Sequence, residues 1–406
     1  MLFRAMADGL PVVKLQGGEE ARIRAGHPWV YATSVAGITG DPGPGDLVQV
    51  TGHGGRPLGE GLYSPRSRVR VRMVRTGTGE PLTDRESLLA LIRERLGSAI
   101  GLRRRLGGST GARLVFGESD GLPGLIVDRY ADCAVVQLLS AGMDALRPAL
   151  AGMVAEIIPA SLLVERSDTG GREREGLPTA RGVLSGTAPE NGLVAFAAGG
   201  LNLMADVLEG QKTGFYLDQA DNWAALRPLG EGRRILDVCC YTGAFGLSLL
   251  SGGGSELLGV DTSKRALGIA GEHARINGLA DRARFTAGDA GGTLAALAAA
   301  GEKFGFVVLD PSALARTKAH RALALRTYRA LNAAAVGVTE PGGFLFSCSC
   351  TPWVGLPELA GAVAGAAREV GRMVRLLEVR GQSRDHPVHP MMPETRYLTG
   401  TLWETG

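Results

Sequence analysis

The chain has 406 residues, of which 45% are hydrophobic and 21% are charged, and its formal net charge is +3 at pH 7. This length predicts two or three domains, and the composition is that of a globular protein. No uncharged apolar run reaches about 18 residues, so no membrane-spanning helix is predicted. The five cysteines and the lack of an apolar core of signal-peptide length near the start predict free thiols in a cytoplasmic protein.

The charge is unevenly distributed along the chain. Residues 1–113 hold 17 Lys and Arg against 10 Asp and Glu, and the remainder is slightly acidic. A basic front part favours a polyanionic partner such as nucleic acid. A composition that is generally rich in arginine would give the same surplus. The placement of the arginines in the fold therefore has to distinguish a nucleic-acid-binding surface from a general compositional bias.

The first predicted domain, residues 1–78, is rich in short strands separated by Gly and Pro. In "PRSRVRVRMV" (65–74), arginines alternate with smaller or apolar residues, which predicts one strand with all the arginines on one face. That face is either a solvated edge strand or a surface that contacts phosphates. The residues concerned are Arg66, Arg68, Arg70 and Arg72.

The second predicted domain, residues 79–184, is an α+β unit. Residues 83–106 have helical spacing, with Thr83 as the expected N-cap. A second helix is expected over about 142–157, between strands on either side. Cys133 falls in one of these strands and is expected to be a core residue.

The third predicted domain, residues 185–406, alternates short apolar strands with alanine-rich helical segments. This pattern predicts an α/β fold with a Rossmann-like parallel sheet covered on both faces. The predicted strands cover 233–239, 256–261, 283–290, 304–310 and 342–349.

Acidic residues and one thiol stand at the predicted carboxyl ends of these strands, where ligands of open α/β sheets bind. In chain order the end residues are Asp237, Asp261, Asp289, Asp310 and Cys348. Each Asp alone could simply cap the following helix. Together they suit a cationic, hydroxyl-rich ligand, and the loop "YTGAFG" lacks the glycine fingerprint of dinucleotide-binding proteins.

The ligand that these groups suit is S-adenosylmethionine. Asp237 can bind the methionine ammonium, and Asp261 can accept hydrogen bonds from the ribose hydroxyls. Asp289 can accept a hydrogen bond from the adenine amino group. Gly243 would let the backbone approach the ligand closely.

Several motifs resemble those of a bacterial family of S-adenosylmethionine-dependent 23S ribosomal RNA cytosine-5 methyltransferases. In the last domain these are "LDVCCYTGAFG", "GVDTSKRALGIAGEHARINGL", "VVLDPSALARTK" and "FSCS". Outside it, "VVKLQGGEEARIRAGHPWVY" resembles the family's N-terminal PUA-type RNA-binding domain and "GESDGLPGLIVDRY" its middle domain. "KTGFYLDQADNW" and "DHPVHPMMPETRYL" are similar to the entry and the end of the catalytic domain, so the ordered set covers the whole chain.

The resemblance implies roles for individual residues. Cys348 would be the nucleophile that adds to carbon 6 of cytosine, and Asp310 would hydrogen-bond the ring near nitrogen 3. Further residues expected to contact the cofactor are Tyr241, Thr242, Phe245, Ser263 and Gln219, and those expected to contact ribosomal RNA are Lys14, Arg66, Arg68, Arg70 and Arg72. A homodimer is implied in the same way, and no metal site is expected because neither cysteine pair has C-x-x-C spacing.

The sequence departs from the family pattern at two places. Asp310-Pro311-Ser312 stands where relatives commonly have Asp-Pro-Pro, with no second cysteine after the proline, and Ala220 stands where the family often has Arg. Two alternatives therefore stay open. One is methylation of another RNA position without a thiol, and the other is an RNA-binding protein without catalysis.

Overall fold

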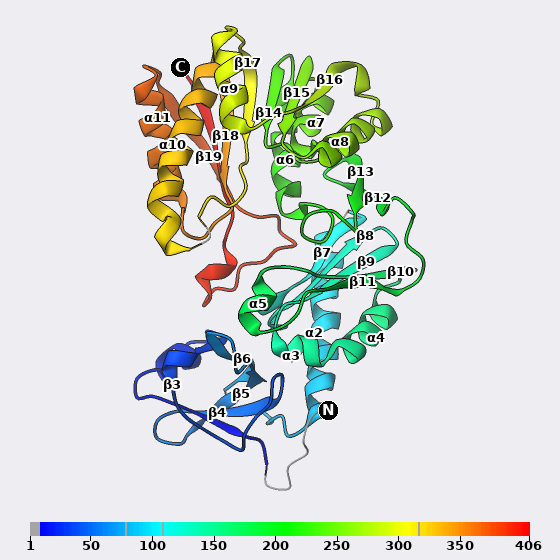
Figure 1. The fold of residues 1–406 in the computed structure, drawn as a ribbon, viewed down its shortest axis with the longest axis vertical. Helices are drawn as coiled ribbons and strands as arrows, with labels where there is room; N and C mark the ends of the chain where they lie inside the picture. Colours follow the sequence, from blue (N-terminus) through cyan, green and yellow to red (C-terminus); the bar gives the residue numbers. More distant parts are fainter. Residues whose placement is uncertain (1–8, 78, 108, 316) are drawn as a thin grey trace. The chain divides into compact units, whose positions relative to one another are not determined.

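The computed structural model describes residues 9–77, 79–107, 109–315 and 317–406. The predicted boundary at residue 78 and the first eight residues lie outside this part of the chain. By backbone proximity, the chain divides into two compact units (Figure 1). Unit 1 comprises Met1–Phe196, Ala205–Leu217 and Asp385–Thr395, and unit 2 comprises Ala197–Met204, Asp218–Arg384 and Arg396–Gly406.

Unit 1 begins with a six-stranded sheet in the order β2-β6-β5-β4-β1-β3. Its strands are β1 (Val12–Leu15), β2 (Trp29–Tyr31), β3 (Val35–Thr39), β4 (Leu47–Thr51), β5 (Pro57–Tyr63) and β6 (Val69–Thr76), and helix α1 covers Glu20–Arg24. Alternate residues of β6, including Val69, Val71 and Met73, are buried, so the period-two pattern of this segment forms a half-buried strand.

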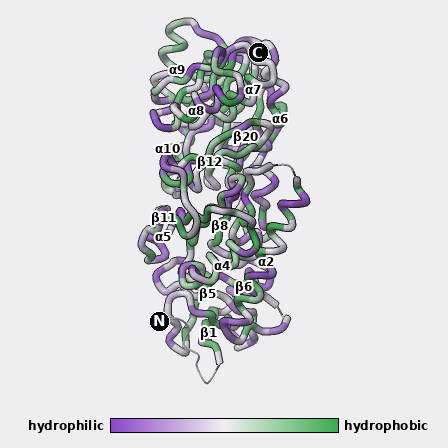
Figure 2. The backbone as a smooth tube through the Cα atoms, turned by 90° about the vertical axis from the view of Figure 1, so that its right-hand side faces the viewer, coloured by the Kyte–Doolittle hydropathy of each residue, from purple (hydrophilic) through white to green (hydrophobic). Residues whose placement is uncertain are grey.

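A five-stranded sheet follows in the order β11-β10-β9-β8-β7. Its strands are β7 (Gly111–Phe116), β8 (Leu125–Tyr130), β9 (Cys133–Leu138), β10 (Leu162–Ser167) and β11 (Ala180–Ser185), with helices α2 (Arg85–Leu106), α3 (Ala141–Ala145), α4 (Arg147–Ile157) and α5 (Gly171–Glu175). The first half of β8 is one of the strongly apolar stretches in Figure 2, and its residues Leu125 and Val127 are fully buried. Cys133 is a core residue, as predicted.

Two local predictions in this region were wrong. The N-cap of α2 is Asp84 rather than Thr83, because the Asp84 carboxylate accepts the backbone N–H of Ser87 at 2.8 Å. The helix expected over 142–157 is divided into α3 and α4 at Leu146, and a proline in the first turn of α4 explains the new start.

Unit 2 is built on a seven-stranded sheet in the order β16-β15-β14-β17-β18-β20-β19. The strands are β14 (Arg234–Val238), β15 (Glu256–Asp261), β16 (Ala283–Ala287), β17 (Phe304–Leu309), β18 (Thr339–Ser349), β19 (Val374–Arg380) and β20 (Thr399–Thr405). The first five strands in chain order are parallel, and β20 runs antiparallel between β18 and β19. The predicted parallel sheet is therefore confirmed, whereas β19 and β20 were not predicted. The short strands β12 (Leu193–Ala198) and β13 (Leu201–Asp206) pair with each other.

Helices cover this sheet on both faces. They are α6 (Ala220–Leu226), α7 (Ala244–Ser251), α8 (Lys264–Ile276), α9 (Ala290–Ala299), α10 (Arg321–Val338) and α11 (Leu356–Glu369). Helices α6, α7 and α8 form one contiguous group, and α9, α10 and α11 form another (Figure 1). All six residues of β17 are buried, as expected for a strand whose successive side chains enter covered faces.

Candidate active site

The strand order reverses between β14 and β17, and the carboxyl ends of these strands carry the predicted acidic residues. Asp237 is the penultimate residue of β14, Asp261 is the last residue of β15, and Asp310 directly follows β17. This point of reversal is where open parallel sheets bind ligands. The structure therefore places three of the four predicted carboxylates at one edge.

Asp289 does not end a strand, contrary to the prediction. Strand β16 stops at Ala287, and Asp289 is the exposed N-cap of α9, where it accepts the backbone N–H of Gly292 at 2.8 Å. The apolar run breaks at Gly288, so the chain leaves the sheet before the acidic residue.

Asp237 is almost fully buried, with 2% of its surface exposed. Burial, together with smaller contributions from the nearby carboxylates of Asp310 and Asp261, raises the pKa of its carboxyl to about 7. The backbone N–H of Gly246, in the first turn of α7, donates to it at 2.8 Å and opposes that shift. A cationic ligand group beside these carboxylates would stabilise their ionised forms.

The loop between β14 and α7 has an unusual backbone. Cys239, Tyr241 and Gly243 all have positive φ, at 64°, 49° and 77°. The backbone N–H of Tyr241 donates to Asp261 Oδ2 at 2.9 Å, which ties the loop to the end of β15. Such conformations cost energy and persist where the surroundings enforce them.

Gly243 is required by packing as well as by its φ angle. A Cβ atom at this position would lie 2.9 Å from Cε1 of Phe285 and 3.2 Å from Cβ of Ala270. The expected role of Gly243 was a close approach of backbone to ligand, but the space beside its Cα is filled by protein. The glycine lets the loop lie against β16 and α8.

His273 is a residue of this site that the sequence analysis missed. It is fully buried on α8, and its Nε2 accepts the backbone N–H of Met204 at 2.8 Å. Its Nδ1 therefore carries the proton and donates to the carbonyl oxygen of Thr242 at 2.9 Å. Burial lowers the pKa of His273, so the neutral ring holds the loop in place.

The remaining predicted cofactor residues are on the same elements. Ser263 caps α8, accepting the backbone N–H of Ala266, and its own N–H donates to Asp261 Oδ1 at 2.9 Å. Phe245 is buried on α7 with its ring centroid 5.0 Å from that of Phe346 in β18.

Cys348 and Asp310 come together at the next strand end through Gln219. The Nε2 atom of Gln219 lies 2.8 Å from Asp310 Oδ2 and 3.5 Å from the Cys348 sulfur. Cys348 has no exposed surface, and burial together with the Asp310 carboxylate raises the pKa of its thiol. Gln219, which was expected to contact the cofactor, contacts both residues expected to be catalytic.

Comparisons with known proteins identify the family of the chain. Residues 13–76 match a PUA-like domain, and residues 176–387 match the S-adenosylmethionine-dependent methyltransferase family. A protein of Aeromonas hydrophila named ribosomal RNA large subunit methyltransferase I is 38% identical over 96% of this chain and 98% of its own length. The protein of the same name from Shewanella amazonensis is 39% identical over the same shares of both chains.

The chain belongs to the S-adenosylmethionine-dependent methyltransferase family. Its cofactor is S-adenosylmethionine, as predicted. A solved structure of a methyltransferase from Streptococcus mutans has the same fold, with a TM-score of 0.81, 14% identity and coverage of 97% of this chain and 99% of that one.

The strand-end residues of the methyltransferase fit this cofactor. S-adenosylmethionine carries a sulfonium and an ammonium group, and Asp237 stands buried near two further carboxylates that raise its pKa. In the part of the chain that the structure describes, no cluster of three or more His, Cys, Asp and Glu side chains could hold a metal ion. Nor is any described helix of the methyltransferase long and apolar enough to cross a membrane.

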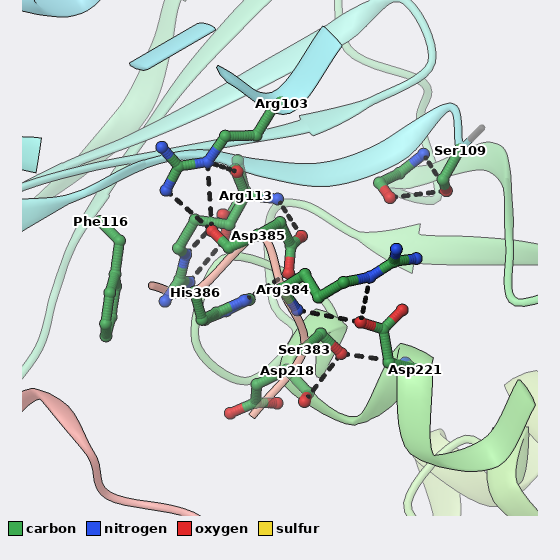
Figure 3. A network of polar contacts seen from close by, with 12 residues as sticks. Arg103, Ser109, Arg113, Phe116, Asp218, Asp221, Ser383, Arg384, Asp385 and His386 are labelled. Atoms are coloured by element: carbon green, nitrogen blue, oxygen red, sulfur yellow. Dashed lines mark hydrogen bonds and ion pairs between the residues drawn. The ribbon is translucent and has the colours of Figure 1, made fainter. Parts of the chain in front are cut away.

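The chain around Gln219 is fixed within unit 2 by the segment that follows β19 (Figure 3). The backbone N–H of Ser383 donates to the carbonyl oxygen of Asp218 at 2.8 Å. Arg384 donates through Nε to Asp221 Oδ2 at 3.1 Å. These contacts hold both ends of the turn that leads into α6.

The next residue, Asp385, belongs to unit 1 and has its own partners there (Figure 3). Its carboxylate accepts the backbone N–H of Arg113 at 2.8 Å, and its carbonyl oxygen accepts Arg103 Nη2 at 2.8 Å. His386 is buried, and its ring centroid lies 5.4 Å from that of Phe116.

The arginine-rich stretch of the PUA-like domain differs from its prediction. Strand β6 begins at Val69, so Arg66 and Arg68 lie in the preceding turn and are exposed, whereas Arg70 and Arg72 are in the strand. The bend at Ser64–Ser67, where the Ser67 side chain accepts the backbone N–H of Val69, explains the later start.

The two strand arginines already have partners within unit 1. Arg72 donates to the buried carboxylate of Glu175 at 2.7 Å and lies over the ring of Trp29. Arg70 donates to the backbone carbonyl oxygens of Ser64 and Pro65. Lys14 on β1 is exposed.

Proposed function

We propose that this methyltransferase transfers a methyl group to carbon 5 of a cytosine in large-subunit (23S) ribosomal RNA through a covalent adduct at Cys348. Two relatives that match over almost the whole chain are named as large-subunit ribosomal RNA methyltransferases, and a PUA-like domain precedes the catalytic one. The observation that carries the cytosine-5 assignment is the Cys348 thiol beside the Asp310 carboxylate, with one amide contacting both.

A thiol is needed because carbon 5 of cytosine is a poor nucleophile. The Cys348 thiolate would add to carbon 6, which makes carbon 5 enamine-like. Asp310 would hydrogen-bond the ring near nitrogen 3 and stabilise the charge that develops there. S-adenosylmethionine, when bound, supplies the methyl group on a sulfonium. Loss of the carbon 5 proton and elimination of the thiolate then restore the ring and the free cysteine.

The base has to leave its stack to reach this site. A duplexed or stacked cytosine presents neither carbon 6 to a thiol nor its pairing edge to a carboxylate. We therefore expect the target to be extruded into a pocket at the carboxyl ends of β17 and β18. The exposed arginines Arg66 and Arg68 and the exposed Lys14 are suited to hold phosphates of the RNA.

One observation favours a second candidate function. Cys348 has no exposed surface, and its thiol has a raised pKa, as a packing cysteine would. The alternative is methylation of another position of the same RNA without a covalent adduct.

Substitution of Cys348 separates the two. With radiolabelled S-adenosylmethionine and unmethylated ribosomal RNA, Cys348→Ala should lower methyl transfer by at least about a thousandfold, because the nucleophile is lost. Binding of S-adenosylhomocysteine should be unchanged. Cys133→Ala, at another buried thiol, is the matched control and should stay active. Retained transfer by Cys348→Ala, or a product other than 5-methylcytosine in the digested RNA, would refute the proposal.

A further inference from the structure

The side-chain amide of Gln219 is placed to act on two groups at once. Gln219 precedes α6, and only 5% of its surface is exposed. One N–H of its amide points to Asp310 Oδ2 at 2.8 Å, and the Nε2 atom lies 3.5 Å from the Cys348 sulfur. A primary amide nitrogen has two N–H donors, so it can serve both acceptors.

The orientation of this amide is fixed by its neighbours. Asn222 Nδ2 donates to Gln219 Oε1 at 2.6 Å, so the oxygen end of the amide is occupied. Asn222 Oδ1 in turn accepts Arg380 Nε at 2.9 Å, and Arg380 can only donate. The chain Arg380–Asn222–Gln219 therefore directs the NH₂ end of Gln219 toward the carboxylate and the thiol.

The thiol needs such a donor because its other surroundings oppose ionisation. Burial is the largest cause of the raised pKa of Cys348, and the negative charge of Asp310 is the next. The hydrogen bond from Gln219 lowers this pKa. The other titratable groups that act on this thiol are Cys350, after β18, and Asp218, before α6. Burial raises the pKa of Tyr328 in α10, and the neighbouring Cys348 contributes to that rise. A carboxylate that helps the base accept charge therefore also hinders formation of the thiolate beside it.

We propose that Gln219 is a positioning residue for both reacting groups: it holds the Asp310 carboxylate and donates an N–H to the Cys348 sulfur as the thiolate forms. This inference rests on the proposed function for its catalytic meaning, because only a covalent route needs the thiolate. It goes beyond the expected role in cofactor binding, and it is argued from the contacts of the Gln219 amide with the two reacting side chains and with Asn222.

The reactivity of the thiol toward iodoacetamide tests the inference without cofactor or RNA. In this reaction the thiolate sulfur forms a bond to carbon and iodide leaves, so the rate below the pKa follows the thiolate fraction. Rates at Cys348 are measured between pH 7 and pH 9.5 by site-resolved mass spectrometry for wild type, Gln219→Met and Gln219→Glu. Met and Glu have nearly the size of Gln, so access to the sulfur changes little.

The expected order of rates follows charge and not size. Gln219→Met loses the donor and should react about tenfold more slowly at each pH. Gln219→Glu places a second carboxylate beside the sulfur and should react more slowly still. Gln137→Met removes another buried amide, which donates to the Arg166 carbonyl oxygen in unit 1, and should leave the rate unchanged.

In methyl transfer, Gln219→Met should lower kcat and leave KM for RNA and the Kd of S-adenosylhomocysteine unchanged.

A second variant keeps the inference testable if Gln219→Met does not fold. Asn222→Asp retains Gln219 but removes the donor that orients it, so the alkylation rate should fall in the same direction by a smaller factor. Equal rates in wild type and all folded variants would overturn the inference, as would a large rise in the Kd of S-adenosylhomocysteine with alkylation unchanged. Failure of the proposed function would instead appear as methyl transfer by Cys348→Ala, whatever the order of alkylation rates.

Discussion

The backbone N–H of Gly246 donates to Asp237 Oδ2 at 2.8 Å, which joins the end of β14 to the first turn of α7. This one hydrogen bond acts on a carboxyl group that burial and two neighbouring carboxylates push toward the protonated form. The pKa of Asp237 consequently lies at about 7, in contrast to its ordinary value of 3.8.

Cofactor affinity should therefore depend on pH around neutrality. Below pH 7 Asp237 is largely protonated, and a ligand ammonium gains less from it, so the Kd of S-adenosylhomocysteine should rise up to about tenfold per pH unit as pH falls from 7 to 5.5. The same raised pKa means that Asp237 contributes stability to the ligand-free fold below pH 4 and that this contribution is lost as pH rises to 7, since ionisation of the buried group costs free energy. A ligand ammonium bound beside Asp237 should offset the stability that is lost when this carboxyl ionises.

Calorimetric titrations from pH 5.5 to 8.5 check the dependence. Asp237→Asn should bind more weakly at pH 8 and show a flat profile across the window. Asp281→Asn, at an exposed residue between α8 and β16, is the control and should keep the wild-type slope. A wild-type Kd that does not change with pH would show that Asp237 does not face the ligand cation.

Two glycines of unit 2 should respond oppositely to alanine. Gly243 has φ of 77°, and an added Cβ would lie 2.9 Å from Cε1 of Phe285, so Gly243→Ala should lower the free energy of unfolding by about 1–3 kcal/mol. Gly268 lies within α8 with nothing within 4 Å of an added Cβ, so Gly268→Ala should raise it by about 0.5–1 kcal/mol. Denaturant unfolding of both variants measures the difference, and equal stabilities would contradict the packing described for the loop.

The arginines of the PUA-like domain should divide into two classes. Arg66→Ala and Arg68→Ala each remove an exposed charge. Loss of one phosphate contact should reduce the slope of the logarithm of the RNA-binding constant against the logarithm of salt concentration by about 0.7–0.9. The melting temperature should not change. Arg72→Ala leaves the buried carboxylate of Glu175 without its ion-pair partner and should destabilise unit 1 by about 3–5 kcal/mol. Salt-dependent binding of ribosomal RNA fragments and thermal unfolding measure the two effects. Unchanged RNA affinity in both turn variants would remove these residues from the interface.

The strands β14, β15, β17 and β18 of the catalytic sheet were predictable because they contain short, nearly continuous apolar runs followed by polar residues. Parallel strands that are buried on both faces need such apolar runs. Because the carboxyl ends of parallel strands lie at one edge of the sheet, the acidic residues that follow them lie close together. The edge strand β19 was missed because most of its residues are exposed and its sequence shows neither a continuous apolar run nor a clear alternation.

The contacts that fix the site were not predictable. Gln219 meets Asp310 and Cys348 across sequence separations of 91 and 129 residues, and no pattern within one segment encodes that meeting. The tether of His273 to the Thr242 carbonyl oxygen is equally non-local. For Arg66 and Arg68, alternation alone suggested a strand, but a serine-stabilised bend delays its start.

The central claim is that Cys348 bonds covalently to carbon 6 of a cytosine during methyl transfer. A ribosomal RNA fragment with 5-fluorocytidine at the target position lacks the carbon 5 proton that must leave, so the adduct should accumulate. Incubation with S-adenosylmethionine should then yield a protein–RNA complex stable to denaturant, with the nucleotide attached to Cys348 by mass spectrometry. Methylated fluorocytidine recovered without any such complex, or a complex formed equally by Cys348→Ala, would contradict the account.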